Sequence, residues 1–392
     1  MNILIIAGVF PPEPVTSACM DYDLASLLSK SHNVTVLRPY PSRPAGVVYK
    51  DSCDRYPFTC VTLDSYTCPE SRLFGRLRES FSFGAHCAKY IKRHHSEIDV
   101  VYNDSWALFG YYLSARACVK YNIPYITPIQ DIYPESLFSN KSWPKFLVKI
   151  AHYTLGYIDR YNQKHANKVR TISDEMADYL ATTRGVHRDN YLVLDNWQND
   201  EDFTYVPIKS KKVIFGYVGS INAHSNTELI IKAFASAKIE NSELRIFGGG
   251  NHKDACVDLV NELGLKNVCF DIVDKKQVPT VQSAVSVLVL ALPKGNGGLC
   301  LPSKMTSYML SGRAILASVE RSATTRYIDE AECGISVEPD NVEMLADAFR
   351  RFSKMDNVEL NRLGANSRKF AEEHLTKSAI LPVISNALIS VK

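Results

Sequence analysis

Residues 1–37 read MNILIIAGVFPPEPVTSACMDYDLASLLSKSHNVTVL, and this stretch decides the fold. Residues 3–7 form a short, continuous apolar run, which is typical of a strand buried on both faces of a parallel sheet. Prolines exclude a helix from residues 8–14, whereas residues 21–28 carry leucines at helical spacing and residues 33–37 predict a second strand. A strand, a helix and a strand in this order form a β-α-β unit, which predicts a parallel sheet.

The same alternation of strands and helices continues along the whole chain. In the first half we expect strands at 99–102, 124–127, 169–172 and 191–194, and helices at 108–121 and 174–182. In the second half we expect strands at 213–218, 243–247, 268–270, 284–292 and 314–317, and helices at 226–237, 254–263, 302–310, 344–352 and 361–374. This pattern predicts an α/β protein of two Rossmann-like, doubly wound parallel-sheet lobes that face each other across a cleft.

The length of the chain favours two domains. Single hydrophobic cores rarely grow beyond about 250–300 residues, whereas this chain has 392. The polar residues 199–212 read as a linker. We therefore place the N-terminal domain at 1–198 and the C-terminal domain at 199–375, and we expect the segment 376–392 to pack back towards the N-terminal domain.

The composition is that of a soluble globular protein, with 46% hydrophobic and 22% charged residues. A net charge of +3 gives no reason to expect a nucleic-acid partner. The ten cysteines include no C-x-x-C pair and no zinc-type spacing with histidine, which is typical of reduced thiols in a cytosolic protein. Because we find no secretory leader and no apolar run of roughly 18–20 residues, we expect a cytoplasmic protein with peripheral contact to the cytoplasmic membrane face.

Three loops follow predicted strands, at the edge where doubly wound sheets bind ligands. The first, residues 10–18, contains no G-x-G-x-x-G, so a nicotinamide oxidoreductase is not expected. Residues 248–250 are all glycine, which lets a backbone approach a ligand closely, although a tight turn needs glycine as well. Residues 294–304, KGNGGLCLPSK, lead into a helix whose first N–H groups and dipole form an anion site. Lys294 and Lys304 would add charge for a diphosphate there, unless both are simply solvated.

Residues 302–317, PSKMTSYMLSGRAILA, resemble the donor-binding helix of the family 4 glycosyltransferases. The resemblance is greatest to the bacterial branch that builds surface polysaccharides such as O-antigen and capsule. Four further stretches resemble motifs of this family in the same order along the chain, namely 10–13 (FPPE), 130–136 (QDIYPES), 195–197 (DNW) and 216–221 (GYVGSI). Together these motifs extend the resemblance over nearly the whole chain.

The resemblance implies a GT-B fold and a retaining hexosyltransferase with no obligatory metal or other cofactor. The implied donor is a UDP- or GDP-linked sugar, and the implied acceptor is a growing surface polysaccharide or a lipid-diphosphate-linked glycan at the cytoplasmic membrane surface. Carried over by motif, the donor-binding residues are Gly219, Ser220, Asn222, Gly248, Gly249, Gly250, Val273, Gly297, Gly298, Leu301, Pro302, Ser303 and Ser307. The acceptor-side residues are Phe10, Pro11, Thr16, Ser17 and Asp104, and the catalytic residues are Asp131, Lys304 and Lys294.

Two groups of these residues have a defined chemical task. Charge that develops on the leaving diphosphate needs fixed donors and cations, which Lys294, Lys304 and the nearby helix N-terminus would supply. Asp131 would hold the acceptor hydroxyl or stabilise the oxocarbenium-like sugar, with Asp104 as the second candidate. The alternative for Asp131 is a turn-capping role before Pro134.

Asp21 and Asp23 match the D-x-D pattern of metal-dependent transferases. We place them at a helix start, where acidic side chains favour the helix dipole, and we expect no metal site.

The chain departs from the family pattern in the donor helix. Ser307 stands where the second of two family glutamates usually grips the ribose, and a serine can make only a neutral hydrogen bond. Two other functions therefore stay open: a nucleotide-sugar 2-epimerase of the same fold, which needs no acceptor, and a non-catalytic GT-B partner subunit. Analysis of the sugar products separates the first from a transferase, and donor binding by Ser307→Glu tests the second.

Two basic, apolar stretches fit an anionic lipid surface, namely residues 72–83 and residues 141–149. The alternative for both is an ordinary solvated helix face over a core.

Overall fold

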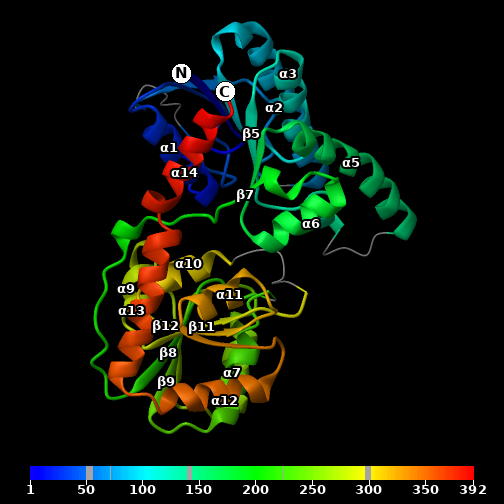
Figure 1. The fold of residues 1–392 in the computed structure, drawn as a ribbon. Helices are drawn as coiled ribbons and strands as arrows, with labels where there is room; N and C mark the ends of the chain where they lie inside the picture. The colour runs from blue at the N-terminus through cyan, green and yellow to red at the C-terminus, as the bar shows by residue number, and fades with distance from the viewer. Residues whose placement is uncertain (50–55, 71, 139–143, 223, 296–301) are drawn as a thin grey trace. The chain divides into compact units, whose positions relative to one another are not determined.

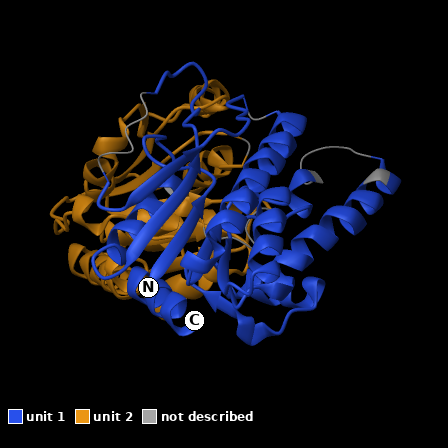
Figure 2. Cartoon of the chain, turned by 90° about the horizontal axis from the view of Figure 1, so that it is seen from above, with its two compact units in different colours: residues 1–194, 381–392 blue, residues 195–380 orange. Residues whose placement is uncertain are grey.

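The computed structural model describes residues 1–49, 56–70, 72–138, 144–222, 224–295 and 302–392 (Figure 1). The chain divides into two compact units, which Figure 2 shows in different colours: unit 1 comprises residues 1–194 and 381–392, and unit 2 comprises residues 195–380. The sequence placed these divisions at 198 and 375. Within the described ranges, no helix is both long enough and apolar enough to cross a membrane.

Unit 1 contains a seven-stranded, all-parallel sheet in the order β3-β2-β1-β4-β5-β6-β7. Its strands are β1 (Asn2–Ala7), β2 (Asn33–Pro39), β3 (Thr59–Leu63), β4 (Val100–Asp104), β5 (Tyr125–Ile129), β6 (Lys168–Thr171) and β7 (Tyr191–Val193). The buried strand β1 is central, with Ile3 in register with Val34 on one side and Val100 on the other. The strand order reverses between β1 and β4, which makes their carboxyl ends the expected ligand site of this sheet.

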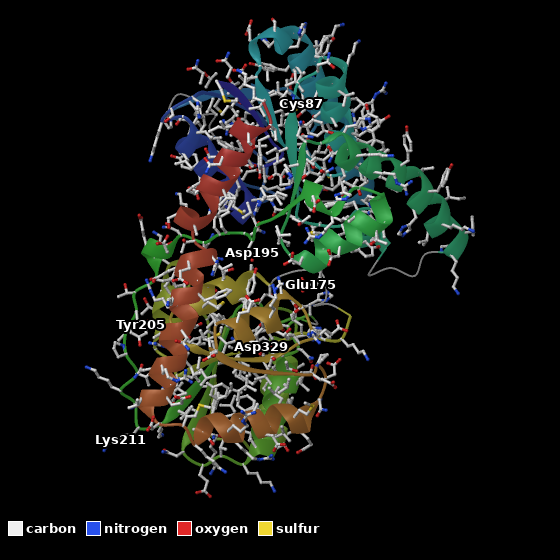
Figure 3. All side chains as sticks on the ribbon, viewed as in Figure 1. Cys87, Glu175, Asp195, Tyr205, Lys211 and Asp329 are labelled. Carbon is white, nitrogen blue, oxygen red and sulfur yellow. The ribbon has the colours of Figure 1, made fainter. Side chains whose placement is uncertain are left out.

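The helices of unit 1 cover both faces of the sheet. They are α1 (Thr16–Leu28), α2 (Leu73–His94), α3 (Phe109–Lys120), α4 (Glu135–Phe138), α5 (Lys145–His165) and α6 (Asp174–Arg184). α3 packs against both α2 and α5, and Cys87 of α2 is buried in the core (Figure 3). The sequence did not predict β3, α2 or α5. It also started α1 five residues late, so Asp21 lies inside the helix and is buried, and our placement of it at the helix start was wrong.

Unit 2 contains a six-stranded, all-parallel sheet in the order β10-β9-β8-β11-β12-β13. Its strands are β8 (Val213–Val218), β9 (Ser242–Phe247), β10 (Val268–Asp271), β11 (Val287–Ala291), β12 (Ala314–Ser318) and β13 (Gly334–Val337). Its helices are α7 (Thr227–Ala237), α8 (Lys253–Glu262), α9 (Val278–Ser283), α10 (Ser303–Leu310), α11 (Ala323–Glu330), α12 (Val342–Ser353) and α13 (Asn357–His374). The order reverses between β8 and β11, so the two units share one topology, and the predicted fold class of two doubly wound parallel sheets is confirmed.

The last helix, α14 (Lys377–Ser390), contains Pro382 and ends in residues that belong to unit 1. Lys392 Nζ forms an ion pair with Asp99 Oδ1 at 2.8 Å. From the sequence we expected the segment 376–392 to pack towards the N-terminal domain, but we did not predict its helix.

Candidate functional site

Lys304 lies against the carboxyl end of β8, beside the switch point of unit 2. Its Nζ stands 4.3 Å from the centroid of the Tyr217 ring and contacts the Tyr217 hydroxyl. Gly219 makes room for this side chain, because a Cβ there would stand 2.3 Å from Lys304 Cε. Burial alone lowers the pKa of Lys304 to about 8, and no acidic side chain among the described residues contributes to that shift. A half-buried cation in these surroundings is stabilised when an anion binds beside it.

The N-terminus of α10 adds a second positive element at the same place. Lys304 is the second residue of this helix, which begins at Ser303. The residue before the helix, Pro302, provides no side-chain cap, and its carbonyl oxygen accepts from Met305 N at 2.8 Å. The N–H groups of Ser303 and Lys304 are therefore the ones that can face a ligand. These N–H groups and the helix dipole favour an anion, as predicted from the sequence pattern.

The glycines at 248–250 have a structural task that the sequence left open. Gly248 and Gly250 have φ values of +153° and +149°, and a Cβ on them would stand 1.9 Å from Gly219 O and 2.1 Å from Ile221 O. The loops after β8 and β9 therefore run backbone against backbone, and Ile221 N donates to Gly249 O at 2.9 Å. Gly249 itself is exposed with open space around its Cβ position, so packing against the loop after β8 does not require a glycine there.

The remaining described donor candidates of unit 2 shape the loops or the core. Asn222 Nδ2 donates to Ser220 Oγ at 3.1 Å, and Asn222 Oδ1 accepts from His224 N at 2.9 Å, which fixes the turn after β8. Val273 packs against the hydrophobic core of unit 2. Ser307 is buried, accepts a hydrogen bond from Gln282 Nε2 at 3.2 Å and donates one to Lys304 O at 2.9 Å.

Lys294 borders a hollow whose described lining residues do not include Lys304, and its predicted role at the diphosphate stays a prediction. The backbone N of Lys294 donates to Asp340 Oδ2 at 3.0 Å. The hollow has a volume of about 770 Å³, and its other lining residues include Glu320, Arg321 and Asp329, the last of which is labelled in Figure 3. The predicted residues Gly297, Gly298 and Leu301 lie outside the described residues, as does the side chain of Thr16.

Unit 1 carries a cavity of about 160 Å³ at its own switch point. We call it the unit 1 cavity; it is lined by Gly8, Val9, Ser17, Arg76, Asp104, Ser105, Trp106, Ala107, Tyr111, Gln130, Asp131 and Tyr133. Three predicted residues, Ser17, Asp104 and Asp131, therefore line the same cavity, although they come from α1, the end of β4 and the loop after β5.

The carboxyl groups at this cavity have raised pKa values. Burial raises the pKa of Asp104 to about 6, while hydrogen bonds from Tyr111 and Asp21 hold it lower than burial alone would. Burial and the neighbouring Asp104 raise the pKa of Asp21 well above its usual range. Asp131 lies at the exposed rim, where partial desolvation raises its pKa as well. At neutral pH, Asp21 therefore holds the proton of the pair and Asp104 is the hydrogen-bond acceptor.

An aromatic and basic wall closes the other side of the unit 1 cavity. The guanidinium carbons of Arg43 and Arg76 stand 4.6 and 4.2 Å from the Trp106 ring centroid. Both arginines also reach Glu79 Oε2, at 2.6 and 3.2 Å. One carboxylate thus meets two guanidinium groups, which leaves this wall positive. Neither Arg76 nor Trp106 was predicted as a site residue. The available signal for Trp106 was its position shortly after the predicted strand at 99–102, at the edge where such sheets bind ligands.

The first predicted loop, residues 10–18, begins with residues that are buried in unit 1 and do not face the unit 1 cavity. Phe10 is buried in an aromatic cluster with Tyr22, Tyr56 and Phe58, and Pro11 O accepts from Arg38 and Tyr56, so neither residue lines the unit 1 cavity.

In the QDIYPES stretch, Glu135 forms an ion pair with Arg184 at 2.8 Å. Arg184 also binds Asp159 at 2.6 Å. Glu135 is therefore a structural anchor for the loop that presents Asp131.

Two family models match consecutive parts of the chain. The model described as Glycosyltransferase Family 4 matches residues 22–201, and the model described as Glycosyl transferases group 1 matches residues 198–370. Among curated proteins, the chain is 24% identical over 268 residues to the probable glycosyltransferase WbjE of Pseudomonas aeruginosa, covering 64% of each chain. It is 24% identical over 238 residues to the putative colanic acid biosynthesis glycosyl transferase WcaI of Escherichia coli, covering 57% of each. The matches thus span less than two thirds of these relatives.

Solved structures with the same fold cover the chain completely. The Anabaena protein HepE, solved in complex with UDP, is 15% identical with a TM-score of 0.71, and each chain is covered to 100%. Sucrose-phosphate synthase of Thermosynechococcus elongatus is 16% identical with a TM-score of 0.73, covering 100% of this chain and 98% of its own. At these identities the likeness concerns the fold.

Proposed function

Because the chain belongs to the family 4 glycosyltransferases, as consecutive family models over residues 22–370 show, we propose that it transfers a sugar from a nucleotide-diphosphate donor to a polysaccharide acceptor. Its fold is GT-B, with two doubly wound parallel sheets. The single observation that carries the proposal is Lys304: a half-buried cation without a carboxylate partner among the described residues, seated at the switch point of unit 2 beside the N-terminus of α10.

Unit 2 is proposed to hold the donor by its diphosphate. Lys304 Nζ and the first N–H groups of α10 would contact the phosphate oxygens, and the exposed backbone of Gly249 would face the nucleoside. The same groups would stabilise the charge that develops on the leaving diphosphate during transfer, so that the chain's own cations serve where other transferases use a metal. The complexes of HepE with UDP and UDP-glucose support a uridine nucleotide as the first donor to test.

Unit 1 is proposed to hold the acceptor sugar in its cavity. Trp106 offers an aromatic face, and Asp104, which is ionised above about pH 6, would accept a hydrogen bond from a sugar hydroxyl. Asp131 at the rim would hold the reacting hydroxyl or the positive charge of the sugar. Transfer with retention to a lipid-diphosphate-linked glycan, as in surface-polysaccharide synthesis, completes the proposal.

The test is a binding titration of the wild type with a panel of UDP- and GDP-sugars, repeated with Lys304→Ala. Lys369→Ala is the matched control, because Lys369 is an exposed lysine on α13 of the same unit. We expect one donor to bind, with roughly tenfold to hundredfold weaker binding in Lys304→Ala, the loss of one charge-assisted contact. Equal binding by all three proteins would contradict the proposed donor site, and binding by none of them would favour a non-catalytic partner subunit.

A further inference from the structure

The first half of α5 exposes apolar side chains along one face. Phe146, Ile150, Tyr153 and Tyr157 are 64%, 57%, 84% and 61% exposed. At about 100° per residue these four positions fall within an arc of about 60° on the helix surface. We call this set the α5 stripe. Solvent-exposed apolar residues in single positions need no explanation, whereas four in line on one helix do.

The second half of the same helix shows that the α5 stripe is not needed to fold unit 1. Asn162 and Gln163 are fully buried; Tyr125 donates to Asn162 O at 2.6 Å and Tyr191 donates to Gln163 Oε1 at 2.9 Å. Asp159 binds Arg184 at 2.6 Å. These contacts fix the helix on the sheet through its other face, and Figures 1 and 2 both show the first turns of α5 extending away from the strands. The α5 stripe is therefore surplus to the core.

The exposed charges on α5 itself are all positive. Lys145 and Lys149 are exposed beside it, and Arg160 and Lys164 continue the same face towards the C-terminal end of the helix. The only acidic residue of α5 is Asp159, which is buried and already paired. A helix with aromatic and aliphatic residues on one face and lysines and arginines beside them fits the boundary between lipid headgroups and acyl chains.

From this arrangement we propose that the α5 stripe docks unit 1 on an anionic lipid surface, with Phe146, Ile150, Tyr153 and Tyr157 in the interface and the flanking cations on the headgroups. A second copy of the chain fits this face poorly. Two copies would bring their lysines and arginines together with no exposed carboxylate on either helix, and four side chains fall far short of the roughly 20–30 residues a side of a stable interface.

The proposal places the lipid contact further along the chain than the sequence did. Of the stretch 141–149, Lys145, Phe146 and Lys149 take part, but Ile150, Tyr153 and Tyr157 lie beyond it. In the stretch 72–83, Phe83 is buried in the core, whereas Phe74 and Phe81 are exposed, so lipid contact by that stretch stays a separate prediction. The inference does not depend on the transfer reaction, because it rests on exposed groups of α5 alone.

The experiment is co-sedimentation of the full chain with vesicles of phosphatidylcholine alone or mixed with phosphatidylglycerol. We expect binding to the anionic vesicles that weakens with added salt, and at least about tenfold weaker binding of the double variant Tyr153→Ser/Tyr157→Ser. The control is Val358→Ser, which removes a similarly exposed apolar side chain from α13 in unit 2 and should bind as the wild type does.

Charge is tested separately with Lys149→Glu/Lys164→Glu, against Lys369→Glu on α13 as the control. We expect loss of anionic-vesicle binding only in the α5 variant. Failure of the wild type to bind anionic vesicles, or unchanged binding by the tyrosine variant, would overturn the proposal. So would a wild-type dimer in light scattering that becomes a monomer in the tyrosine variant, because the α5 stripe would then be a protein interface. Donor binding in solution is measured independently, so its failure and the failure of lipid docking remain distinguishable.

Discussion

The pKa of Lys304 makes donor binding depend on pH in a defined direction. Burial lowers this pKa to about 8 in the free protein, from a usual value of 10.5. A bound diphosphate favours the charged form and raises the pKa again. Donor affinity is therefore expected to be constant below about pH 8 and to fall as pH rises above it, by about tenfold at about pH 9, one pH unit above the pKa of the free lysine.

The assay is isothermal titration with a nucleotide sugar between about pH 7 and about pH 9.5, in two buffers of different ionisation heat. The diphosphate of a nucleotide sugar does not titrate in this range, but the ring N–H of uracil or guanine begins to titrate at its upper end. Because that contribution is common to both proteins, the difference in proton uptake between the wild type and Lys304→Met reports Lys304. We expect uptake of up to one proton near pH 9 and none near pH 7.

Two variants sharpen this reading. Lys304→Arg keeps its charge throughout the range, so its affinity should not change with pH. Lys304→Met keeps the bulk without the charge, so its affinity should be low and also independent of pH. Removing a desolvated charge should leave this variant at least as stable as the wild type at neutral pH, because the desolvation cost is present below the folded pKa of about 8 and disappears as pH rises towards 10.5. A wild-type donor affinity that does not change from about pH 7 to about pH 9.5 would show that deprotonation of Lys304 does not weaken donor binding.

Three further predictions concern the scaffold. Gly219→Ala should lower the free energy of unfolding by about 1–3 kcal/mol and weaken donor binding, because φ is +147° and the new Cβ meets Lys304. Gly249→Ala, with open space around its Cβ position, should be as stable as the wild type. Urea denaturation compares the two variants, and equal stability would contradict the packing described. Arg184→Met should lower the free energy of unfolding by about 3–5 kcal/mol, because it leaves the buried Asp159 and the half-buried Glu135 without their cation. Arg188→Met, whose ion pairs are exposed, should cost about 0–1 kcal/mol, and similar denaturation midpoints for both variants would count against this anchor. Asp21→Asn should lose less stability than the wild type as pH rises from acidic to neutral. A carboxyl whose pKa is raised in the folded state stabilises the fold below its unfolded pKa, and this contribution is lost as pH rises through the folded pKa. Parallel curves of stability against pH for the two proteins would disprove the raised pKa.

The sequence predicted the fold class because both sheets are parallel and buried, and buried parallel strands are continuous apolar runs. The strand 213–218 is one example, and it matches β8 residue for residue. β3 was missed because it is a half-exposed edge strand whose residues Thr59 and Thr62 interrupt the apolar pattern. α5 was missed for the opposite reason: its apolar residues face outward, so its hydrophobic pattern does not mark the core.

The candidate site was partly predictable. Lys304 and the α10 N-terminus follow from a local pattern of glycine, proline and lysine at a helix start. Arg76 and Trp106 meet only in the folded chain, and nothing in their spacing indicates that they stack. Gly248 illustrates the limit of a motif, because the backbone of Gly219 accounts for this glycine without any ligand. Residue type alone did not separate these two roles.

We propose above all that this chain releases a sugar from a nucleotide-diphosphate donor held at Lys304. The most direct measurement is the release of nucleoside diphosphate from each UDP- and GDP-sugar, in the presence of lipid-linked glycan acceptors, by the wild type, Lys304→Arg and Lys304→Met. We expect release from one donor by the wild type, retained in part by Lys304→Arg. In Lys304→Met we expect the rate of release to be lower by about two to three orders of magnitude, the range for removal of one stabilising group at a developing anion. Release by Lys304→Met at the wild-type rate, or no release from any donor, would contradict the proposal.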